Sequence, residues 1–325
     1  MKAQRIVEIS EDGRFIGVER GFLIVKNSSL ELGKIPLDDI ASIITFSNYT
    51  TFSSELISRL AEYNIPLVVC DKITKKPTST LVTLDGNYRQ GDVFLAQAES
   101  TKPLKKSLWQ IVIKHKLLQQ AEVLKFFKKT DATILLGGLA TVVKSGDPEN
   151  IEGRAAAAYW KALMGDFFRR DRDAEDENIL FNYGYTILRA ATLRSICGAG
   201  LHPSLGLHHM SSTNPARLAD DLIEPFRPFI DLEVKEICMS GESKELNAKN
   251  KKRLAGVIDR KIILKERDTT IQILMHHLAK SLAQIFLKER NDLNLEVVSY
   301  KNFYVKKAIY NESKRVQTDV DDGDV

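Results

Sequence analysis

The spacing of apolar residues changes once along this chain, close to residue 84, and this change restricts the possible folds more than any other feature. Before that point, turn residues such as Asp12-Gly13 separate short runs rich in Val, Ile and Phe, a pattern typical of β-strands. The runs are RIVEIS, RFIGVER, FLIVK, ASIITF and PLVVC. One segment, TFSSELISRLAEY, carries Leu56, Ile57 and Leu60 at helical spacing instead, which predicts a helix packed on one face of the sheet.

After the turn-like LDGN at 84–87, the apolar spacing is helical almost to the end of the chain. Two stripes show it: Leu104, Leu108, Ile111 and Leu118, and then Ile271, Leu274, Leu278 and Leu282. The sequence therefore predicts an α+β fold, in which a small β-rich domain over residues 1–88 precedes a larger all-α domain over residues 89–312. Residues 313–325 are polar and acidic, and we expect them to form a disordered tail.

Composition excludes several classes of protein. Of the 325 residues, 43% are apolar and 28% are charged, as in ordinary folded proteins. There is no run of 18 apolar residues and no apolar core of a signal peptide, so we expect a cytoplasmic protein that does not bind membranes. The three cysteines, Cys70, Cys197 and Cys238, are far apart and lack C-x-x-C spacing, which favours reduced, buried thiols over disulfides or a zinc site.

Positive charge is concentrated in two runs. The net charge of +4 includes four Asp of the tail at 319–325, and removing them leaves +8 on residues 1–318. Residues 102–129 hold eight Lys against the single acid Glu122, and residues 249–265 form a second basic run. Such runs attract nucleic acids through counterion release, although a solvated helix face has the same composition. The candidate contacts with DNA are Lys102, Lys105, Lys106, Lys251, Lys252 and Arg253.

The first half of a candidate site lies in DPENIEGRAAAAYWKALMGDFF, residues 147–168. This segment predicts a helix with Asp147 as its N-cap and Pro148 in the first helical position. Glu152 then lies one turn inside the helix, and the following Gly153 allows a ligand or a neighbouring backbone to approach closely. The helix dipole also favours acids near a helix N-terminus, so this segment alone favours an ordinary surface glutamate over a ligand.

The second half is GLHHMSSTNPARLADDLIEPFRPF, residues 206–229. Asn214-Pro215 predicts a helix start, which places Asp221 and Glu224 at positions i and i+3 on one face. The adjacent pair His208-His209 then lies in the loop before this helix. A set of His and carboxylate ligands suits Mg²⁺ or Mn²⁺ better than structural zinc.

The spacing leaves two interpretations of this pattern open. A carboxylate from a separate helix, such as Glu152, would complete three protein ligands and leave open positions for phosphate oxygens and water. Paired histidines can equally be structural, as expected for His276-His277, which has no acid nearby on its helix. Residue spacing alone therefore does not decide between a metal site and a structural pair.

Three segments in this order resemble one known family. IEGRAAAAYW, NYGYTILRAATLRSICGAGLHPSLGLHH and RLADDLIEPFRPFID, behind a β-rich N-terminal domain, resemble the CRISPR-associated integrase/endonuclease family, the catalytic subunit of the spacer-acquisition complex. The likeness covers nearly the whole chain. The histidine doublet and the length look most like members that accompany a single-protein RNA-guided effector. One departure is the loop after the doublet, MSSTNPAR, where such relatives often have Asn and Phe.

The resemblance implies a role for each matched residue. The side chains that would bind Mg²⁺ or Mn²⁺ are Glu152, His209 and Glu224. Asp221 would be a supporting catalytic acid, and Arg227 would hold a phosphate beside the site. Tyr183 would lie near the DNA end, and His208 would support the loop.

The resemblance also implies a reaction and an assembly. The 3′-hydroxyl of a short captured DNA fragment would attack a phosphodiester at the edge of a CRISPR repeat, and water in its place would give nuclease activity. The chain would form a homodimer through its β-rich domains, and a small partner protein would bridge two dimers. Two alternatives remain: a repair or junction nuclease that uses the same metal residues, and a non-catalytic DNA-binding subunit that would tolerate loss of the acids.

Overall fold

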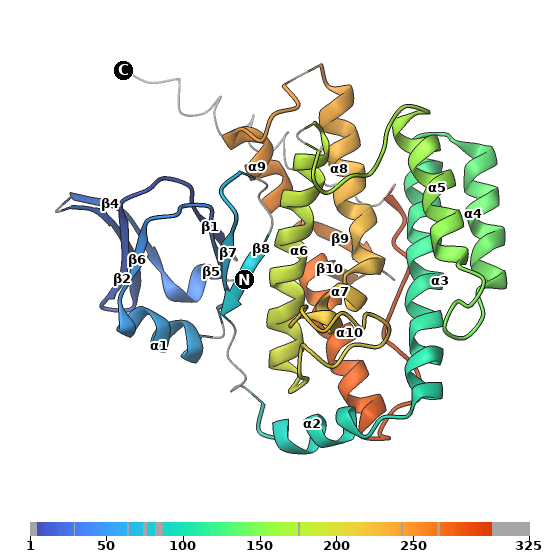
Figure 1. The fold of residues 1–325 in the computed structure, drawn as a ribbon, viewed down its shortest axis with the longest axis horizontal. Helices are drawn as coiled ribbons and strands as arrows, with labels where there is room; N and C mark the ends of the chain where they lie inside the picture. Colours follow the sequence, from blue (N-terminus) through green and yellow to red (C-terminus); the bar gives the residue numbers. More distant parts are fainter. Residues whose placement is uncertain are drawn as a thin grey trace.

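The protein is described by a computed structural model in which strands precede helices (Figure 1). The described residues are 5–28, 30–63, 65–73, 77–81, 87–174, 176–241, 243–264 and 267–300. The predicted α+β fold is confirmed, because a strand-rich N-terminal part lies beside a larger helical part. The division after residue 88 stays a prediction, and the predicted acidic tail at 313–325 lies outside the described residues.

The N-terminal part contains two four-stranded sheets. The first has the order β1-β5-β7-β8, with β1, β5 and β7 parallel and β8 antiparallel to β7. Its strands are β1 (Arg5–Ile9), β5 (Ile40–Thr45), β7 (Leu67–Cys70) and β8 (Pro77–Leu81). The second sheet has the order β4-β3-β2-β6. Its strands are β4 (Leu30–Pro36), β3 (Phe22–Asn27), β2 (Arg14–Glu19) and β6 (Thr50–Phe52).

The predicted strands and the interrupting helix are confirmed. The helix α1 (Ser54–Glu62) begins after Ser53, whose hydroxyl accepts a hydrogen bond from the amide of Leu56. Leu56 and Leu60 are buried in one core with Ile16 of β2 and residues of β1, β3, β5 and β7, so α1 closes the space between the sheets. Strands β4, β6 and β8 were not predicted, because the first is mostly exposed, the second is three residues long and the third begins with Pro77.

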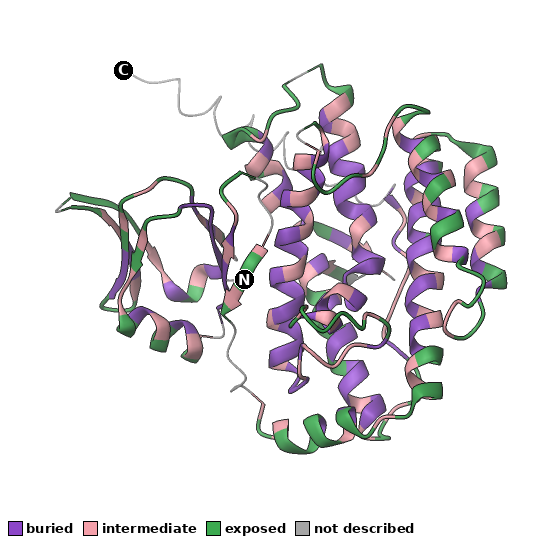
Figure 2. Ribbon diagram, in the orientation of Figure 1, coloured by how far each residue is buried: buried purple, intermediate pink, exposed green. Residues whose placement is uncertain are grey.

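The helical part surrounds the long helix α6, which is buried along most of its length (Figure 2). Its helices are α2 (Gln90–Ala98), α3 (Lys102–Phe126), α4 (Thr130–Val142), α5 (Ile151–Met164), α6 (Asn178–Gly198), α7 (Arg217–Leu222), α8 (Arg227–Met239), α9 (Ala248–Ala255) and α10 (Ile271–Phe286). A short hairpin of β9 (Lys261–Leu264) and β10 (Arg267–Thr270) joins α9 to α10. Gly184 lets α8 approach α6 closely, because a Cβ atom at this position would collide with Ile230.

The two predicted apolar stripes are buried to different degrees. In α10, Ile271, Leu278 and Leu282 are buried, whereas in α3 Leu108 is buried and Leu118 is exposed. The single stripe fails for α3 because α4, α5, α7 and α8 all contact this helix, so it is buried on several sides. None of the helices in the described part of the chain is long and apolar enough to cross a membrane.

The cysteines behave as the sequence predicts. Cys70, Cys197 and Cys238 are free thiols, the first two buried and the third half-buried. Burial raises the pKa of the Cys197 thiol to about 11, which keeps it protonated and unreactive at neutral pH.

Candidate functional site

Glu152 lies in the first turn of α5, and the N-cap residue of this helix is not the one that the sequence predicted. The helix begins at Ile151, and the N-cap is Asn150, whose left-handed backbone has a φ of 49°. Asp147 was predicted to be the N-cap, but its carboxylate lies outside the helix and accepts hydrogen bonds from the amides of Ile151 and Glu152, both at 2.9 Å. Two polar side chains therefore satisfy the first amides, since Asn150 also accepts a bond from the amide of Gly153 at 3.2 Å.

Glu152 and Glu224 meet at a single lysine. The ammonium of Lys116, in the middle of α3, lies 2.6 Å from Oε1 of Glu152 and 2.6 Å from Oε2 of Glu224. The other carboxylate oxygen of Glu224 lies 3.2 Å from a guanidinium nitrogen of Arg227. Two acids that are far apart in the sequence thus converge on one cation.

The position of Glu224 differs from the prediction in one respect. Helix α7 ends at Leu222, and Glu224 begins the 3₁₀ turn η2 (Glu224–Phe226). Asp221 and Glu224 therefore do not lie on one continuous α-helix, because Pro225 follows at a point where a helix would need its amide. The side chain of Glu224 is nevertheless almost completely buried, with 3% of its surface exposed.

The buried charges stabilise one another. Burial alone would raise the pKa of Glu224, but the charges of Arg227 and Lys116 outweigh burial and hold this pKa below its usual value. Burial alone would lower the pKa of Lys116, but Glu224 and Glu152 outweigh it and hold that pKa above its usual value. Lys116 and Glu224 are therefore charged at neutral pH.

Asp221 organises the histidine loop. Its buried carboxylate accepts hydrogen bonds from the amides of Leu207, His208 and His209, at 2.5, 3.2 and 3.1 Å. It also lies 2.7 Å from Nδ1 of His209, and a side chain at Gly206 would crowd it. Because a carboxylate accepts the Nδ1 proton, Nε2 of the neutral His209 ring is left free to bind another group. The bond to Asp221 raises the pKa of His209, although burial opposes this shift.

The two histidines of the doublet have different surroundings. The exposed ring of His208 stacks on the buried Trp109, with ring centroids 4.3 Å apart and an angle of 3° between the planes. His209 meets the same indole only edge-on at 6.0 Å, and it lies close enough to Glu224 for the charges of the two side chains to interact. His208 therefore anchors the loop by packing, and His209 faces the acids.

The side chains of Glu152, Glu224 and His209 are of the types that bind a hard divalent ion, but a lysine now lies between the two acids. Over the described ranges of the chain, no three His, Cys, Asp or Glu side chains lie close enough together to hold a metal ion. Lys116 lies between the two glutamates in this conformation. The carboxylates of Glu152 and Glu224 nevertheless converge on one cation, and His209 has the carboxylate partner that metal-binding histidines usually have.

Arg227 lies at the site and Tyr183 does not. The guanidinium of Arg227 pairs with Glu224 and lies 4.9 Å from the ring centre of Tyr185. The hydroxyl of Tyr183 instead donates a hydrogen bond of 2.8 Å to Glu8 of β1. Tyr183 and Tyr185 are two positions apart on α6 and therefore point to different sides. The tyrosine beside the site is thus Tyr185, and the NYGY pattern does not reveal which of the two it is.

The first basic run does not form one surface. Lys102, Lys105 and Lys106 lie in the first turns of α3, and no ion pair engages them within the described ranges. Lys116 belongs to the same run but is buried between two acids. The sequence pattern gave Lys116 no role of its own, because the packing of α5 and η2 against α3 is what distinguishes this lysine from the others of the run.

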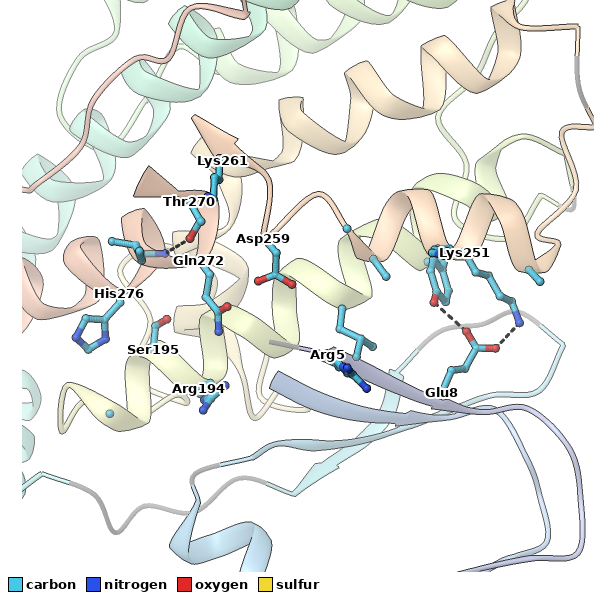
Figure 3. A pocket seen from close by; sticks show the side chains of 18 of the residues that line it. Arg5, Glu8, Arg194, Ser195, Lys251, Asp259, Lys261, Thr270, Gln272 and His276 are labelled. Carbon is cyan, nitrogen blue, oxygen red and sulfur yellow. Dashed lines mark hydrogen bonds and ion pairs between the residues drawn. The ribbon is translucent and has the colours of Figure 1, made fainter. Parts of the chain in front are cut away.

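The second basic run lines a separate cleft of about 1200 Å³ between β1, α6, α9 and the start of α10 (Figure 3). Lys251 and Lys252 line this cleft, and Lys251 pairs with Glu8. Arg253 does not line it, because its guanidinium lies 2.7 Å from the buried Glu233. Further basic residues of the cleft are Arg5, Arg194 and Lys261.

Comparison with known proteins decides the family. The family described as CRISPR associated protein Cas1 matches residues 7–266 of the chain. The chain belongs to the Cas1 family. A CRISPR-associated endonuclease Cas1 from Neisseria meningitidis serogroup C (strain 8013) is 38% identical over 234 residues, which are 72% of this chain and 76% of the relative.

Solved structures share the Cas1 fold of this chain. A casposase bound to integration product has a TM-score of 0.75 at 21% identity, and the match covers 97% of this chain and 100% of the casposase. A chain of a Cas6-RT-Cas1–Cas2 complex has a TM-score of 0.74 at 20% identity, and the match covers 92% of this chain and 36% of the other. At these identities the likeness establishes the fold.

Proposed function

We propose that this Cas1-family chain is a divalent-metal-dependent DNA integrase and endonuclease that inserts short foreign DNA fragments into a CRISPR array. The observation that carries the proposal is the convergence of Glu152 and Glu224 on one cation, beside a histidine that Asp221 orients. The relatives support it, because one is named a CRISPR-associated endonuclease and a similar structure is a casposase bound to an integration product.

In this proposal Glu152, Glu224 and Nε2 of His209 hold Mg²⁺ or Mn²⁺. The bound ion supplies Lewis-acid stabilisation of the charge that develops on the phosphate as the fragment 3′-hydroxyl displaces the repeat-edge 3′-oxygen. Asp221 is a positioning residue and not a metal ligand, because its oxygens are occupied by three backbone amides and by His209. Arg227 binds a phosphate oxygen next to the acids, and the ring of Tyr185 fixes the position of its guanidinium.

The DNA backbone contacts lie at two places. Lys102, Lys105 and Lys106 at the start of α3 supply one set. Arg5, Lys252 and Lys261 of the cleft supply the other, because their side chains make no hydrogen bond or ion pair among the described residues. Arg253 and Lys251 contribute less, since buried Glu233 holds the first and Glu8 holds the second.

The proposed assembly is a homodimer formed through the β-rich part, with a small partner protein between two dimers. Strand β4 is at the edge of its sheet and exposes Leu30 and Leu32, with exposed fractions of 66% and 47%. An exposed apolar edge strand is a surface that a second chain can extend. The Cas6-RT-Cas1–Cas2 structure supports a partner protein of the Cas2 kind.

Strand transfer into plasmid DNA tests the proposal. A labelled short duplex is incubated with Mn²⁺ or Mg²⁺ and a supercoiled plasmid carrying a CRISPR repeat, with and without the small partner. The wild type is expected to join the duplex to the plasmid only when metal is present. His209→Ala is expected to lose joining and keep DNA binding, whereas His277→Ala, an exposed histidine of α10, is expected to behave like the wild type.

The same experiment separates the alternatives. Cleavage without joining, in the presence of the folded partner, would favour a repair nuclease. Tight binding with neither cleavage nor joining would favour a non-catalytic DNA-binding subunit. Undiminished joining by both His209→Ala and Glu152→Ala would refute the assignment of the site.

A further inference from the structure

We propose that Lys116 is an internal cation that occupies the metal position in the metal-free protein and must leave it when a divalent ion binds. This inference rests on the proposed metal-dependent function and adds a way to regulate the same site. Lys116 is a positioning residue in this scheme, because it acts through the two glutamates.

The first observation is the geometry of the lysine. Its Nζ lies 2.6 Å from one oxygen of Glu152 and 2.6 Å from one oxygen of Glu224, and 9% of its side chain is exposed. The two acids come from different elements, the start of α5 and the turn η2, and this ammonium contacts both of them. An ammonium is a compact point charge and thus resembles a metal ion more closely than a guanidinium does.

The second observation is that both cations need the same space. Mg²⁺ binds carboxylate oxygens at about 2.0–2.1 Å, so an ion held by Glu152 and Glu224 would lie where Nζ of Lys116 lies now. Two positive charges do not share such a position, because their repulsion is strong where water is excluded. Metal binding therefore requires Nζ to move away on its flexible side chain.

The third observation is that Arg227 leaves the shared position free. It contacts Oε1 of Glu224, whereas Lys116 contacts Oε2. Once Lys116 has moved, Arg227 still neutralises part of the charge of Glu224, and the oxygen that Lys116 left is available to the ion. The lysine thus stabilises the metal-free protein and weakens metal binding by competition.

Lys116→Met tests the exchange, because methionine is similar in length and carries no charge. In EDTA the variant is expected to melt at a lower temperature than the wild type, since two acids then face each other without their cation. In a calorimetric titration it is expected to bind Mn²⁺ about tenfold more tightly or better, and Mn²⁺ should raise its melting temperature more than that of the wild type. Lys125→Met, on the same helix but exposed beside Glu122, is the control that should change neither value. Unchanged or weaker Mn²⁺ binding by Lys116→Met would overturn the inference.

A measurement on the wild type covers the case in which the variant does not fold. The protein is treated with an amine-acetylating reagent in EDTA and in Mn²⁺, and acetylation of Lys116 is measured by peptide mass spectrometry relative to Lys125. Acetylation of Lys116 is expected to increase several-fold in Mn²⁺, because the displaced side chain reaches solvent. Equal acetylation in the two conditions would also overturn the inference.

These outcomes separate the inference from the function on which it rests. If the wild type joins DNA in a metal-dependent manner but Lys116→Met binds Mn²⁺ no better, the exchange is wrong and the proposed function stands. If neither folded protein binds Mn²⁺ and the wild type joins DNA in EDTA, the metal-dependent function itself is wrong.

Discussion

The buried acid cluster and the open basic cleft are both rich in charge, but they differ in how these charges are paired. In the cluster, Lys116, Glu152, Glu224 and Arg227 each contact a group of opposite sign. In the cleft, among the described residues, Arg5, Lys252 and Lys261 have no ion-pair partner. Charges that are removed from water must be paired within the protein, whereas hydrated charges need no protein partner and stay available to bind a ligand. This difference supports the proposal that the cluster carries the chemistry and the cleft binds nucleic acid.

One carboxylate in each region shows the same difference. The pKa of Glu224 is held below its usual value because Arg227 and Lys116 outweigh burial. Burial raises the pKa of Asp259, which lines the cleft, to about 6, and Arg194 opposes the shift only in part. The strength of the opposing positive charge therefore sets the direction of the pKa shift, because burial raises the pKa of both carboxylates.

The largest expected effect is on catalysis in the cluster. Glu152→Gln should lower the rate of DNA joining on the order of a thousandfold, because the proposed metal ion would stabilise the transition state by several kcal/mol. DNA affinity should stay the same, since the cleft is unaffected. Glu149→Gln is the matched control, because Glu149 lies just before the same helix and pairs with the exposed Lys144. Equal loss in both variants would contradict the assignment of chemistry to the cluster.

Asp221→Asn should affect both the stability and the metal affinity of the cluster. An amide has one acceptor oxygen, so some of the amides of Leu207, His208 and His209 would lose their partner, at a cost of about 1–3 kcal/mol in unfolding free energy. Metal affinity should fall about 10–100-fold, because His209 loses the carboxylate that orients it. Urea denaturation and Mn²⁺ titration measure the two effects. A variant with normal Mn²⁺ affinity would show that Asp221 acts on the loop alone.

Much of the fold follows from local sequence, but the composition of the cluster does not. Strands with β-branched runs were predicted correctly, whereas β8, with the sequence PTSTL, lacks the apolar alternation that identifies a strand. Glu152, His209 and Glu224 were predicted as the metal ligands through the motifs that carry the family resemblance, and this set stays a prediction. Lys116 is one lysine among eight in a basic run, and its role depends on which side of α3 faces α5 and η2. Such tertiary packing leaves no signal in the spacing of residues.

A smaller effect is expected in the cleft. Replacing both Lys252 and Lys261 by Ala should weaken duplex DNA binding several-fold. The slope of the logarithm of the binding constant against the logarithm of salt concentration should fall by about two, because about two phosphate contacts are lost. Joining by the protein that remains bound should be nearly normal, because the cluster is intact. Fluorescence anisotropy at several salt concentrations measures the effect, with Lys26→Ala, a half-buried lysine paired with Glu19 in the β-rich part, as the control. An unchanged salt slope would exclude the cleft as a DNA contact.

The smallest effect is the pH dependence of stability from the cleft. The pKa of Asp259 is about 6 in the folded protein, above the ordinary value of 3.8, so its contribution to stability is present below pH 3.8 and is lost as pH rises through 6. The unfolding free energy of the wild type, measured relative to Asp259→Asn, should therefore fall between pH 4 and about pH 7. Asp92→Asn, an exposed carboxylate of α2, should give no such trend. Parallel stability curves for the wild type and Asp259→Asn would contradict the shifted pKa.

A crystal of the protein grown with Mn²⁺, with anomalous diffraction data collected at the manganese absorption edge, would test the proposed metal centre directly. We expect an anomalous peak between Glu152 and Glu224, next to Nε2 of His209, with the ammonium of Lys116 moved away. No peak at this position, or a peak only in the basic cleft, would contradict the claim that these residues form the metal centre.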